Sequence, residues 1–281
     1  MPLVGGAPNG GHPLRMWVEG FVSGFRALRR EPVLGLKGLI LPVSYWRSQE
    51  FAYVWRQLGL PRGARVLDLG SPKTLAPVLA RRRGYRIVAT DILPATVALG
   101  DRYARAQSQA GPAVGSVESE VQDGRALTYP DASFDAAYSI SVLEHIPNGG
   151  DSQAIREVLR VVRPGGLVVA TVPFDRRYRE TFVQGPVYER APAGGEPVFY
   201  ERHYDRPALV ERLLTNELAE IVDVSYWGEG AIRGEAILAR LGAWRAPLYP
   251  WEALLATLLL QRVEPDGPRH PMAAFFTLRR R

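Results

Sequence analysis

Three acidic residues each follow an expected strand in the first half of the chain. Asp68 follows Val66-Leu67, Asp91 follows a second apolar run, and Asp123 lies just beyond the third expected strand, Ser116–Val121. Roughly 20 to 30 residues separate neighbouring acids, which is the length that a strand, a helix and their turns require. Because the carboxyl ends of parallel strands meet at one edge of a sheet, this spacing predicts that the three side chains share a single site.

Each acid suits a different part of a nucleoside that carries an amino-acid group. Asp68 is followed by Gly70, a serine and a proline, a pattern typical of a strand that turns into a helix. The positive end of that helix would attract a carboxylate, while Asp68 would hold an ammonium group. Asp91 either accepts both ribose hydroxyls or caps the helix that follows it. Asp123 and the backbone of Gly124 could read the amine and ring nitrogen of adenine.

Two residues that directly follow the fourth apolar segment, Glu144 and His145, could remove a proton from a bound hydroxyl group. An imidazole has an ordinary pKa of about 6.5, so it exchanges a proton near neutral pH. His145 therefore serves either as a base or as a packing residue beside the ligand. His203 is the second candidate base, or else it forms a surface hydrogen bond. Upstream, Arg47 either binds a ligand carboxylate in bidentate geometry or is an exposed arginine.

A parallel sheet with crossover helices must position these residues, and short apolar runs alternate with helical stretches from Ala64 onward. The expected strands are Arg65–Leu69, Arg86–Thr90, Ser116–Val121, Phe134–Ser139 and Leu167–Val172. The clearest helices between them are Pro72–Arg82, Pro94–Gln107 and Gln153–Val162. The last helix is followed by Arg163-Pro164-Gly165-Gly166, a turn that stops a helix and leads into a strand.

The flanking segments differ from this central pattern. Residues 1 to about 14 are rich in glycine and proline, which predicts disorder. Apolar spacing predicts helices over 16–30 and 44–58, ahead of the first strand. Residues 174–204 indicate an irregular lid or substrate segment. Beyond it we expect a helix at Pro207–Leu214, a strand at Glu220–Tyr226, a helical insertion over 231–270 and an edge strand at Ala273–Leu278.

Over about residues 44–175, the chain resembles the class I S-adenosylmethionine-dependent methyltransferases. The motifs that carry the resemblance are Asp68-Leu69-Gly70, Asp91, Asp123-Gly124, Phe134-Asp135-Ala136-Ala137-Tyr138 and Arg163-Pro164-Gly165-Gly166. The resemblance implies a doubly wound, seven-stranded and mostly parallel α/β sheet with an antiparallel last strand. Residues 1–43 would form a tail and helical extension, 44–175 the cofactor-binding core, and 176–281 the substrate segment, the insertion and the last two strands.

The resemblance also implies S-adenosylmethionine as the cofactor and S-adenosylhomocysteine as the product. The expected cofactor-binding residues are Arg47, Asp68, Gly70, Ser71, Asp91, Ile92, Asp123, Gly124 and Ser139, and the candidate catalytic residues are His145, Glu144 and His203. The chain departs from the family in its first loop, where Pro72 and Thr74 replace the usual second and third glycines. We expect cofactor binding to survive, because the proline keeps the turn rigid and Gly70 supplies the backbone contact.

The favoured activity is methyl transfer to an oxygen or nitrogen of a small molecule. An RNA acceptor is the nearest alternative, favoured by Arg176, Arg177, Arg179 and the terminal arginines 279–281, although no appended RNA-binding module is recognisable. A nicotinamide-dependent oxidoreductase is disfavoured, because the first loop lacks G-x-G-x-x-G and Asp68 would repel a pyrophosphate. A non-catalytic protein that retains the cofactor-binding fold is the alternative from another class.

The composition limits the remaining possibilities. Of 281 residues 46% are hydrophobic, which supports a large core, and a net charge of +6 is only a weak sign of an anionic partner. The absence of cysteine excludes thiolate metal sites and disulfides, and we expect no metal site. No apolar run is long enough to cross a bilayer, so we expect a cytoplasmic protein. The aromatic stretch Trp244–Leu260 is either core packing, a homodimer interface or a substrate surface.

Overall fold

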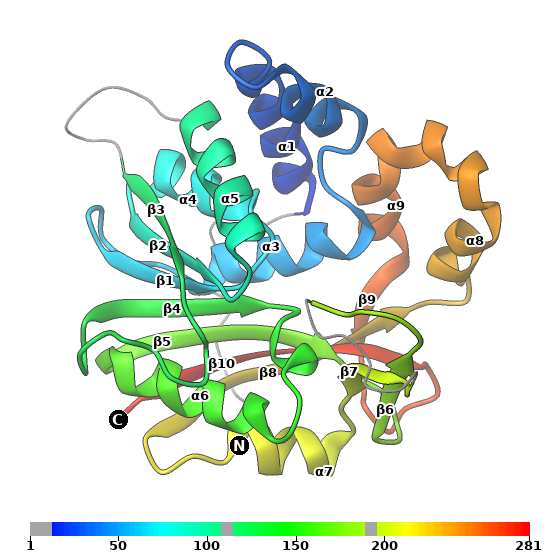
Figure 1. Ribbon diagram of the computed structural model, residues 1–281. Helices are drawn as coiled ribbons and strands as arrows, with labels where there is room; N and C mark the ends of the chain where they lie inside the picture. Colours follow the sequence, from blue (N-terminus) through cyan, green and yellow to red (C-terminus); the bar gives the residue numbers. More distant parts are fainter. Residues whose placement is uncertain (1–12, 108–114, 189–195) are drawn as a thin grey trace.

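The computed structural model describes residues 13–107, 115–188 and 196–281, which build an α/β fold around one large sheet (Figure 1). Eight strands lie in the order β3-β2-β1-β4-β5-β10-β8-β9. Their bounds are β1 Arg65–Leu69, β2 Arg86–Asp91, β3 Ser116–Val121, β4 Phe134–Ile140, β5 Val162–Pro173, β8 Ala219–Glu229, β9 Leu260–Val263 and β10 Pro271–Arg280. Strands β1 to β5 are mutually parallel, whereas β10 runs antiparallel to both β5 and β8.

Helices cover both faces of this sheet (Figure 1). One face carries α3 Tyr45–Gln57, α4 Leu75–Arg83 and α5 Pro94–Gln107, with α1 Pro13–Ala27, α2 Pro32–Ile40, α8 Gly234–Leu241 and α9 Glu252–Leu259 on the same side of the molecule. The opposite face carries α6 Gly150–Val161 and α7 Arg206–Leu209, the latter extended by a π-helical turn over Val210–Leu214. The predicted doubly wound class is confirmed.

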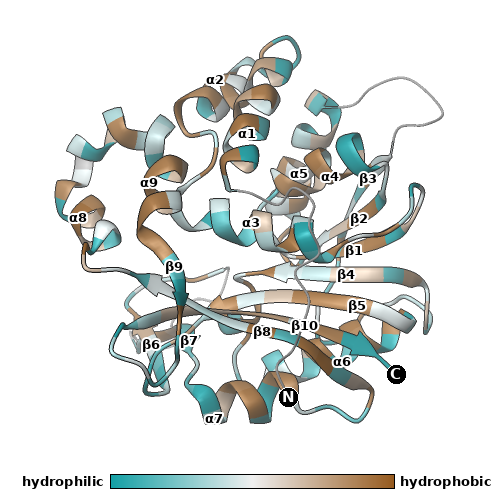
Figure 2. Cartoon of the chain, turned by 180° about the vertical axis from the view of Figure 1, so that it is seen from behind, coloured by the Kyte–Doolittle hydropathy of each residue, from teal (hydrophilic) through white to brown (hydrophobic). Residues whose placement is uncertain are grey.

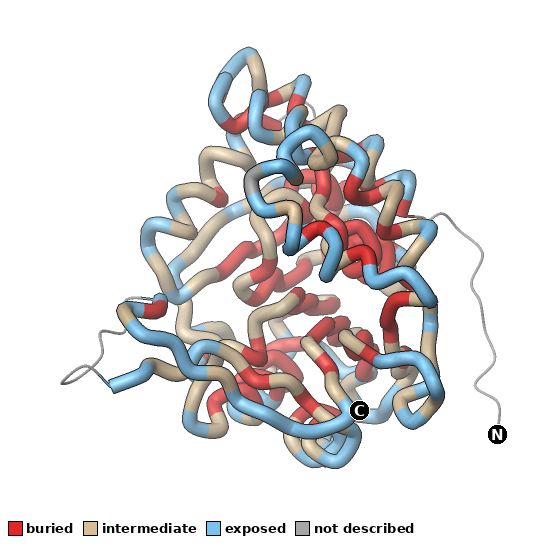
Figure 3. Tube along the Cα trace, turned by 90° about the vertical axis from the view of Figure 1, so that its right-hand side faces the viewer, coloured by how far each residue is buried: buried red, intermediate tan, exposed pale blue. Residues whose placement is uncertain are grey.

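Alternation along the strands divides the core into two layers. Val66 of β1 packs in a cluster with residues of α3 and α4, whereas its neighbour Leu67 packs in a second cluster with residues of α6. Successive side chains of a strand point to opposite faces, and in a sheet covered on both sides both faces are apolar. Figure 2 shows apolar residues along the central strands, and Figure 3 shows the buried residues concentrated inside the molecule.

Several expected elements have different forms in the structure. The sheet contains eight strands in its described part rather than seven, because β9 ends the insertion and pairs antiparallel with β8. The described part of segment 174–204 contains a pair of antiparallel strands rather than only irregular structure, with β6 Arg179–Val183 paired to β7 Val198–His203, and residues 189–195 lie outside the described residues. The sequence Arg163–Gly166 already belongs to β5, whose pairing with β4 shifts register there.

Two further predictions concern the amino-terminal region and membrane insertion. Residues 1–12 of the predicted disordered tail lie outside the described residues, and the helix expected at 16–30 begins earlier, at Pro13. Within the described ranges, every helix falls short of the length and apolarity that crossing a membrane requires.

Candidate active site

A cavity of about 460 Å³ opens at the carboxyl ends of the first four strands, and we call it the strand-end cavity. Its volume lies within the ordinary range for small-molecule sites, about 300–1,000 Å³. The predicted residues among those that line it are Gly70, Asp91, Ile92, Asp123, Gly124 and His145. Asp91 and Asp123 therefore meet in a single cavity, whereas the spacing along the chain predicted that Asp68 would join them there.

Asp91, at the end of β2, keeps part of its hydrogen-bonding capacity for a ligand. Its Oδ1 accepts a hydrogen bond from the backbone N–H of Leu93 at 3.0 Å, and its Oδ2 forms an ion pair with Lys73 Nζ at 3.0 Å. An ionised carboxylate offers about four lone-pair sites. One site on each oxygen therefore remains for a diol such as the two hydroxyls of a ribose.

Asp123, just beyond β3, is held by an arginine two residues further along the chain. Arg125 Nη2 lies 2.6 Å from Asp123 Oδ2, and Arg125 Nε also donates to the same carboxylate. These hydrogen bonds lower the pKa of Asp123, so the carboxylate is charged at neutral pH. The pair presents an acceptor and a planar cation at the end of the cavity that Gln122 and Gly124 line.

Asp68, in contrast, does not line the strand-end cavity. Its side chain is completely buried, where Oδ2 accepts a hydrogen bond from the Tyr138 hydroxyl at 2.8 Å and Oδ1 accepts one from the Ser71 N–H at 3.1 Å. Ser71 Oγ in turn accepts from the backbone N–H of Ile140, and Ser139 Oγ donates to the carbonyl of Leu69. None of these three predicted residues lines the strand-end cavity, and their hydrogen bonds tie the end of β1 and the loop after it to β4.

Gly70 lies in this loop and adopts a left-handed backbone with φ of 67°. A Cβ at this position would lie 2.9 Å from Val142 Cγ1, closer than real Cβ atoms approach. Only glycine therefore lets the backbone of the loop lie against Val142, which itself lines the strand-end cavity. Pro72 and Thr74, which replace the family's further glycines, lie outside this wall.

A second cavity, of about 550 Å³, adjoins the first, and we call it the polar cavity. The two cavities share Ser141 and His145 in their walls. The other predicted residues that line the polar cavity are Arg47, Glu144 and His203. The three candidate bases therefore line one cavity. Arg47 lines it too, although the sequence assigned this arginine to the cofactor, whose expected cavity it does not line.

Ser141 lies at the boundary between the two cavities. Its φ of 51° is a left-handed conformation that costs a serine on the order of 1–3 kcal/mol and that surrounding contacts must maintain. Ser141 Oγ accepts a hydrogen bond from Arg47 Nη1 and donates one to Glu50 Oε1, each at 2.8 Å. Glu50 is buried and also accepts from Thr171, so this network fixes Arg47 in the wall of the polar cavity.

His145 is oriented by the paired strands β6 and β7 and the residues beside them. Its Nδ1 lies 2.8 Å from the carbonyl oxygen of Tyr200 in β7, and its ring packs edge-on against the rings of Tyr188 and Tyr200. A carbonyl can only accept, so Nδ1 carries the proton and the neutral ring keeps Nε2 as its basic nitrogen. Nε2 lies 3.9 Å from Glu144 Oε1.

Glu144 is almost completely buried, with 1% of its surface exposed. Burial raises the pKa of its carboxyl group well above the ordinary value, an effect that nearby Arg47 opposes. Its Oε2 has no hydrogen-bond partner among the described residues. A buried carboxyl group with an unused oxygen, next to a histidine and in a cavity wall, can hold a proton or receive one.

His203, the other candidate base, lies further along β7 with partners of its own. Its Nε2 is 3.0 Å from Glu201 Oε1, and its Nδ1 is 3.0 Å from Arg179 Nη2. Both ring nitrogens are therefore engaged by residues of β6 and β7, which weakens the case for His203 as a base. Unlike His145, it does not line the strand-end cavity.

Sequence reasoning missed Ser141 and Glu50, which control the boundary between the cavities. Ser141 directly precedes Val142 in the segment that contains Glu144, so its position after β4 was a usable signal. Its backbone conformation had no sequence signal, since serine rarely adopts positive φ. Glu50 lies in a helix before the first strand and reaches the site only through the fold.

Residues 67–170 match the family described as a methyltransferase domain. The chain is 33% identical over 125 residues to a 2-methyl-6-phytyl-1,4-hydroquinone methyltransferase from Synechocystis sp., which covers 43% of this chain and 36% of that protein. It is 29% identical over 183 residues to a ubiquinone biosynthesis O-methyltransferase from Xanthomonas oryzae pv. oryzae, covering 62% of this chain and 69% of that protein.

A third relative, a ubiquinone/menaquinone biosynthesis C-methyltransferase from Hydrogenovibrio crunogenus, is 34% identical over 112 residues, 38% of this chain and 41% of that protein. The chain thus spans less than half of the length of the Synechocystis and Hydrogenovibrio relatives.

Solved structures share the fold over most of the chain at low sequence identity. A methyltransferase from Methanosarcina mazei has a TM-score of 0.51 and 21% identity, covering 79% of this chain and 94% of that one. The cyclase SpnF has a TM-score of 0.53 and 21% identity, covering 85% of this chain and 83% of that one. The matched domain, the strand order and a cavity at the strand ends together show that the chain contains a methyltransferase domain with the class I S-adenosylmethionine-dependent methyltransferase fold.

Proposed function

We propose that this chain transfers a methyl group from S-adenosylmethionine to an oxygen or nitrogen atom of a small-molecule acceptor. The observation that carries the proposal is that the strand-end cavity and the polar cavity share Ser141 and His145. A cofactor in the first cavity and an acceptor in the second would meet at these residues. In-line displacement at a methyl group depends on such alignment more than on covalent help from the protein.

The residues of the strand-end cavity fit the cofactor. Asp91 and Asp123 are carboxylates that can accept hydrogen bonds from sugar hydroxyls and from an exocyclic amine. Ile92 is exposed and, with Val142, offers apolar surface to a base or ribose. Gly70 allows backbone approach, and a Cβ there would disturb this wall. When bound, S-adenosylmethionine supplies an electrophilic methyl group on a sulfonium.

In this proposal His145 takes the proton from the acceptor. Its Nδ1 donates to the Tyr200 carbonyl, which leaves Nε2 as the basic nitrogen beside Glu144. Loss of a proton makes a hydroxyl group nucleophilic at oxygen, and general-base assistance typically contributes 10²- to 10⁴-fold. Arg47, held by Glu50 and Ser141, orients the polar end of the acceptor.

The relatives support a hydroxylated aromatic acceptor, since their names refer to a hydroquinone and to ubiquinone biosynthesis. The arginines that favoured an RNA acceptor are partly engaged within the protein. Arg176 donates to the carbonyl of Arg269, and Arg179 and Arg279 pair with acids. These contacts favour a small molecule over RNA.

Isothermal titration with S-adenosylhomocysteine tests the cofactor assignment. We expect Asp91→Ala to weaken binding about 10- to 100-fold, because it removes the charged acceptor for the ribose hydroxyls. Asp131→Ala is the matched control, since this exposed acid forms an ion pair with Arg160 away from the cavity. It should bind as the unaltered protein does, and absence of binding by the unaltered protein would overturn the proposal.

A further inference from the structure

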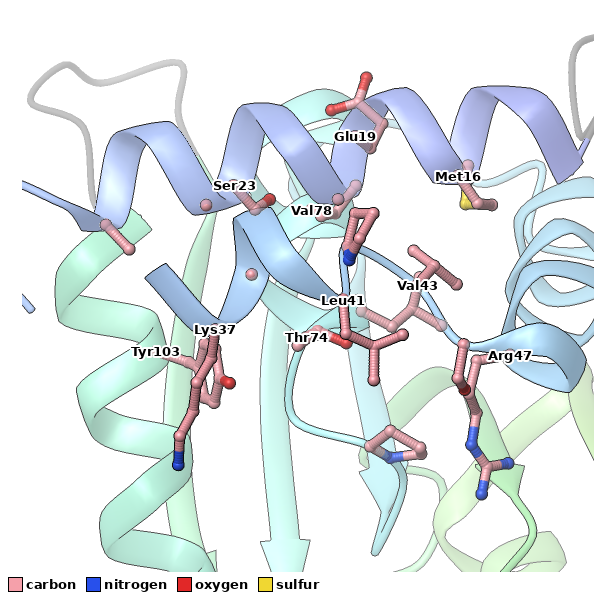
Figure 4. Close-up of a pocket in the computed structure, with 18 of the residues that line it drawn as sticks. Met16, Glu19, Ser23, Lys37, Leu41, Val43, Arg47, Thr74, Val78 and Tyr103 are labelled. Atoms are coloured by element: carbon pink, nitrogen blue, oxygen red, sulfur yellow. The ribbon is translucent and has the colours of Figure 1, made fainter. Parts of the chain in front are cut away.

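A third cavity, of about 460 Å³, lies between α1 and α2 on one side and α4 and α5 on the other (Figure 4). We call it the helix cavity. Met16, Leu41, Val43 and Val78 contribute apolar side chains to its walls. Its acidic residue, Glu19, is neutralised by ion pairs with two arginines of α4. An apolar cavity of this size gains free energy by enclosing an apolar ligand.

The helix cavity adjoins the candidate active site, because the two have wall residues in common. It shares Ser44 and Arg47 with the polar cavity. The polar cavity in turn shares Ser141 and His145 with the strand-end cavity. Arg47 Nη1 donates to Ser141 Oγ, so one hydrogen bond links the walls of all three cavities. A ligand that reaches from the site of methyl transfer past Arg47 would enter the helix cavity.

The ends of the helix cavity differ from its middle. Its exposed lining residues are Lys37, Ile40 and Leu41, so the cavity opens to solvent where α2 ends. Ser23 lies at the end opposite Arg47 (Figure 4), and Gln107 Nε2 donates to its carbonyl. The Ser23 end of the helix cavity is therefore polar. The apolar part of the cavity lies between Ser23 and Arg47.

We infer that the acceptor is amphiphilic, with its reacting head in the polar cavity and an apolar chain in the helix cavity. This inference rests on the proposed function, because it assumes that the polar cavity holds the acceptor. The two cavities differ in chemistry as the two parts of such a molecule do. The polar cavity is lined by charged side chains from several elements, whereas the helix cavity has mostly apolar walls.

A series of 4-alkylphenols, from 4-methylphenol to 4-nonylphenol below their aggregation concentrations, tests the inference by isothermal titration. Each methylene that enters an apolar cavity should tighten the Kd by up to about fourfold, since its burial is worth about 0.8 kcal/mol. Leu41→Trp would fill the mouth and Val78→Phe the interior. In both variants we expect affinity to stop rising at shorter alkyl chains than in the unaltered protein, while 4-methylphenol binds with unchanged Kd.

Leu36→Trp is the matched control, because Leu36 is exposed on the same helix α2 but does not line the cavity. It should preserve the full dependence on chain length. A flat series in the unaltered protein, or an unchanged series in both filled variants, would overturn the inference. If Val78→Phe fails to fold, Leu41→Trp at the exposed mouth still decides.

The titration is run with and without S-adenosylhomocysteine. If the unaltered protein does not bind S-adenosylhomocysteine, the proposed function is refuted. The dependence of phenol affinity on chain length reports on the helix cavity alone.

Discussion

At the scale of single residues, Glu144 is an acid that the fold buries without satisfying both of its oxygens. Its pKa is raised by burial, so the folded protein binds a proton that the unfolded chain releases as pH rises. The stabilising contribution of this proton is complete below the unfolded pKa and is lost as pH rises through the folded one. The same burial that suits Glu144 to proton exchange thus makes folding weaker at higher pH.

We predict that the effect of Glu144→Gln on the free energy of unfolding is more favourable at pH 8 than at pH 5. The difference should be at most about 1.4 kcal/mol for each pH unit. Chemical denaturation at a series of pH values measures the difference. Glu157→Gln should instead destabilise the protein by a similar amount at both pH values, because hydrogen bonds from Arg160 lower the pKa of Glu157 and its charge already stabilises the fold above the unfolded pKa. A pH-independent difference between Glu144→Gln and the unaltered protein would contradict the assignment.

At the scale of elements, the loop after β1 depends on one glycine. Gly70→Ala should destabilise the fold by about 1–2 kcal/mol from left-handed strain alone, and further because its Cβ meets Val142. Gly63→Ala is the matched control, since Gly63 also has positive φ but no atom lies near its Cβ. In a double variant that carries Gly70→Ala and Val142→Ala, the loss of stability should fall towards that of Gly63→Ala. Equal losses in the two single variants, by urea denaturation, would refute the contact.

The elements also show how far the sequence could predict this fold. Asp91 follows a strand with a strong apolar pattern, and Asp123 follows the next expected strand along the chain, so their shared cavity was predictable. Asp68 has the same local pattern, but its direction is set by Tyr138, a partner 70 residues away that only the folded sheet brings near. Strand β9 was missed because it continues directly from the leucine-rich helix α9, whose pattern conceals the change.

At the scale of the whole molecule, an ion-pair cluster joins the amino-terminal helices to the central fold. Glu19 of α1 lies 2.8 Å from Arg81 and 2.9 Å from Arg82, and the side chains of Glu19 and Arg81 are each 6% exposed. Truncating one partner of a buried pair typically costs about 3–5 kcal/mol, because the other charge remains buried. The α1 helix therefore owes much of its attachment to this contact.

We predict that Glu19→Ala lowers the free energy of unfolding by about 3 kcal/mol, measured by denaturant titration. Glu220→Ala serves as its control, since the Glu220–Arg279 pair is about half exposed and should change stability little. Similar losses from both variants would show that burial does not decide the strength of the Glu19 contact.

Strand β10 follows every other described strand in the sequence, yet it lies between β5 and β8. During synthesis, β8 and β9 therefore emerge from the ribosome before the strand that joins them to the rest of the sheet has emerged. Until residues 271–280 emerge, the edges of β5 and β8 stay open to pairing with other chains. Translation thus leaves a late interval in which the nascent chain is exposed to aggregation.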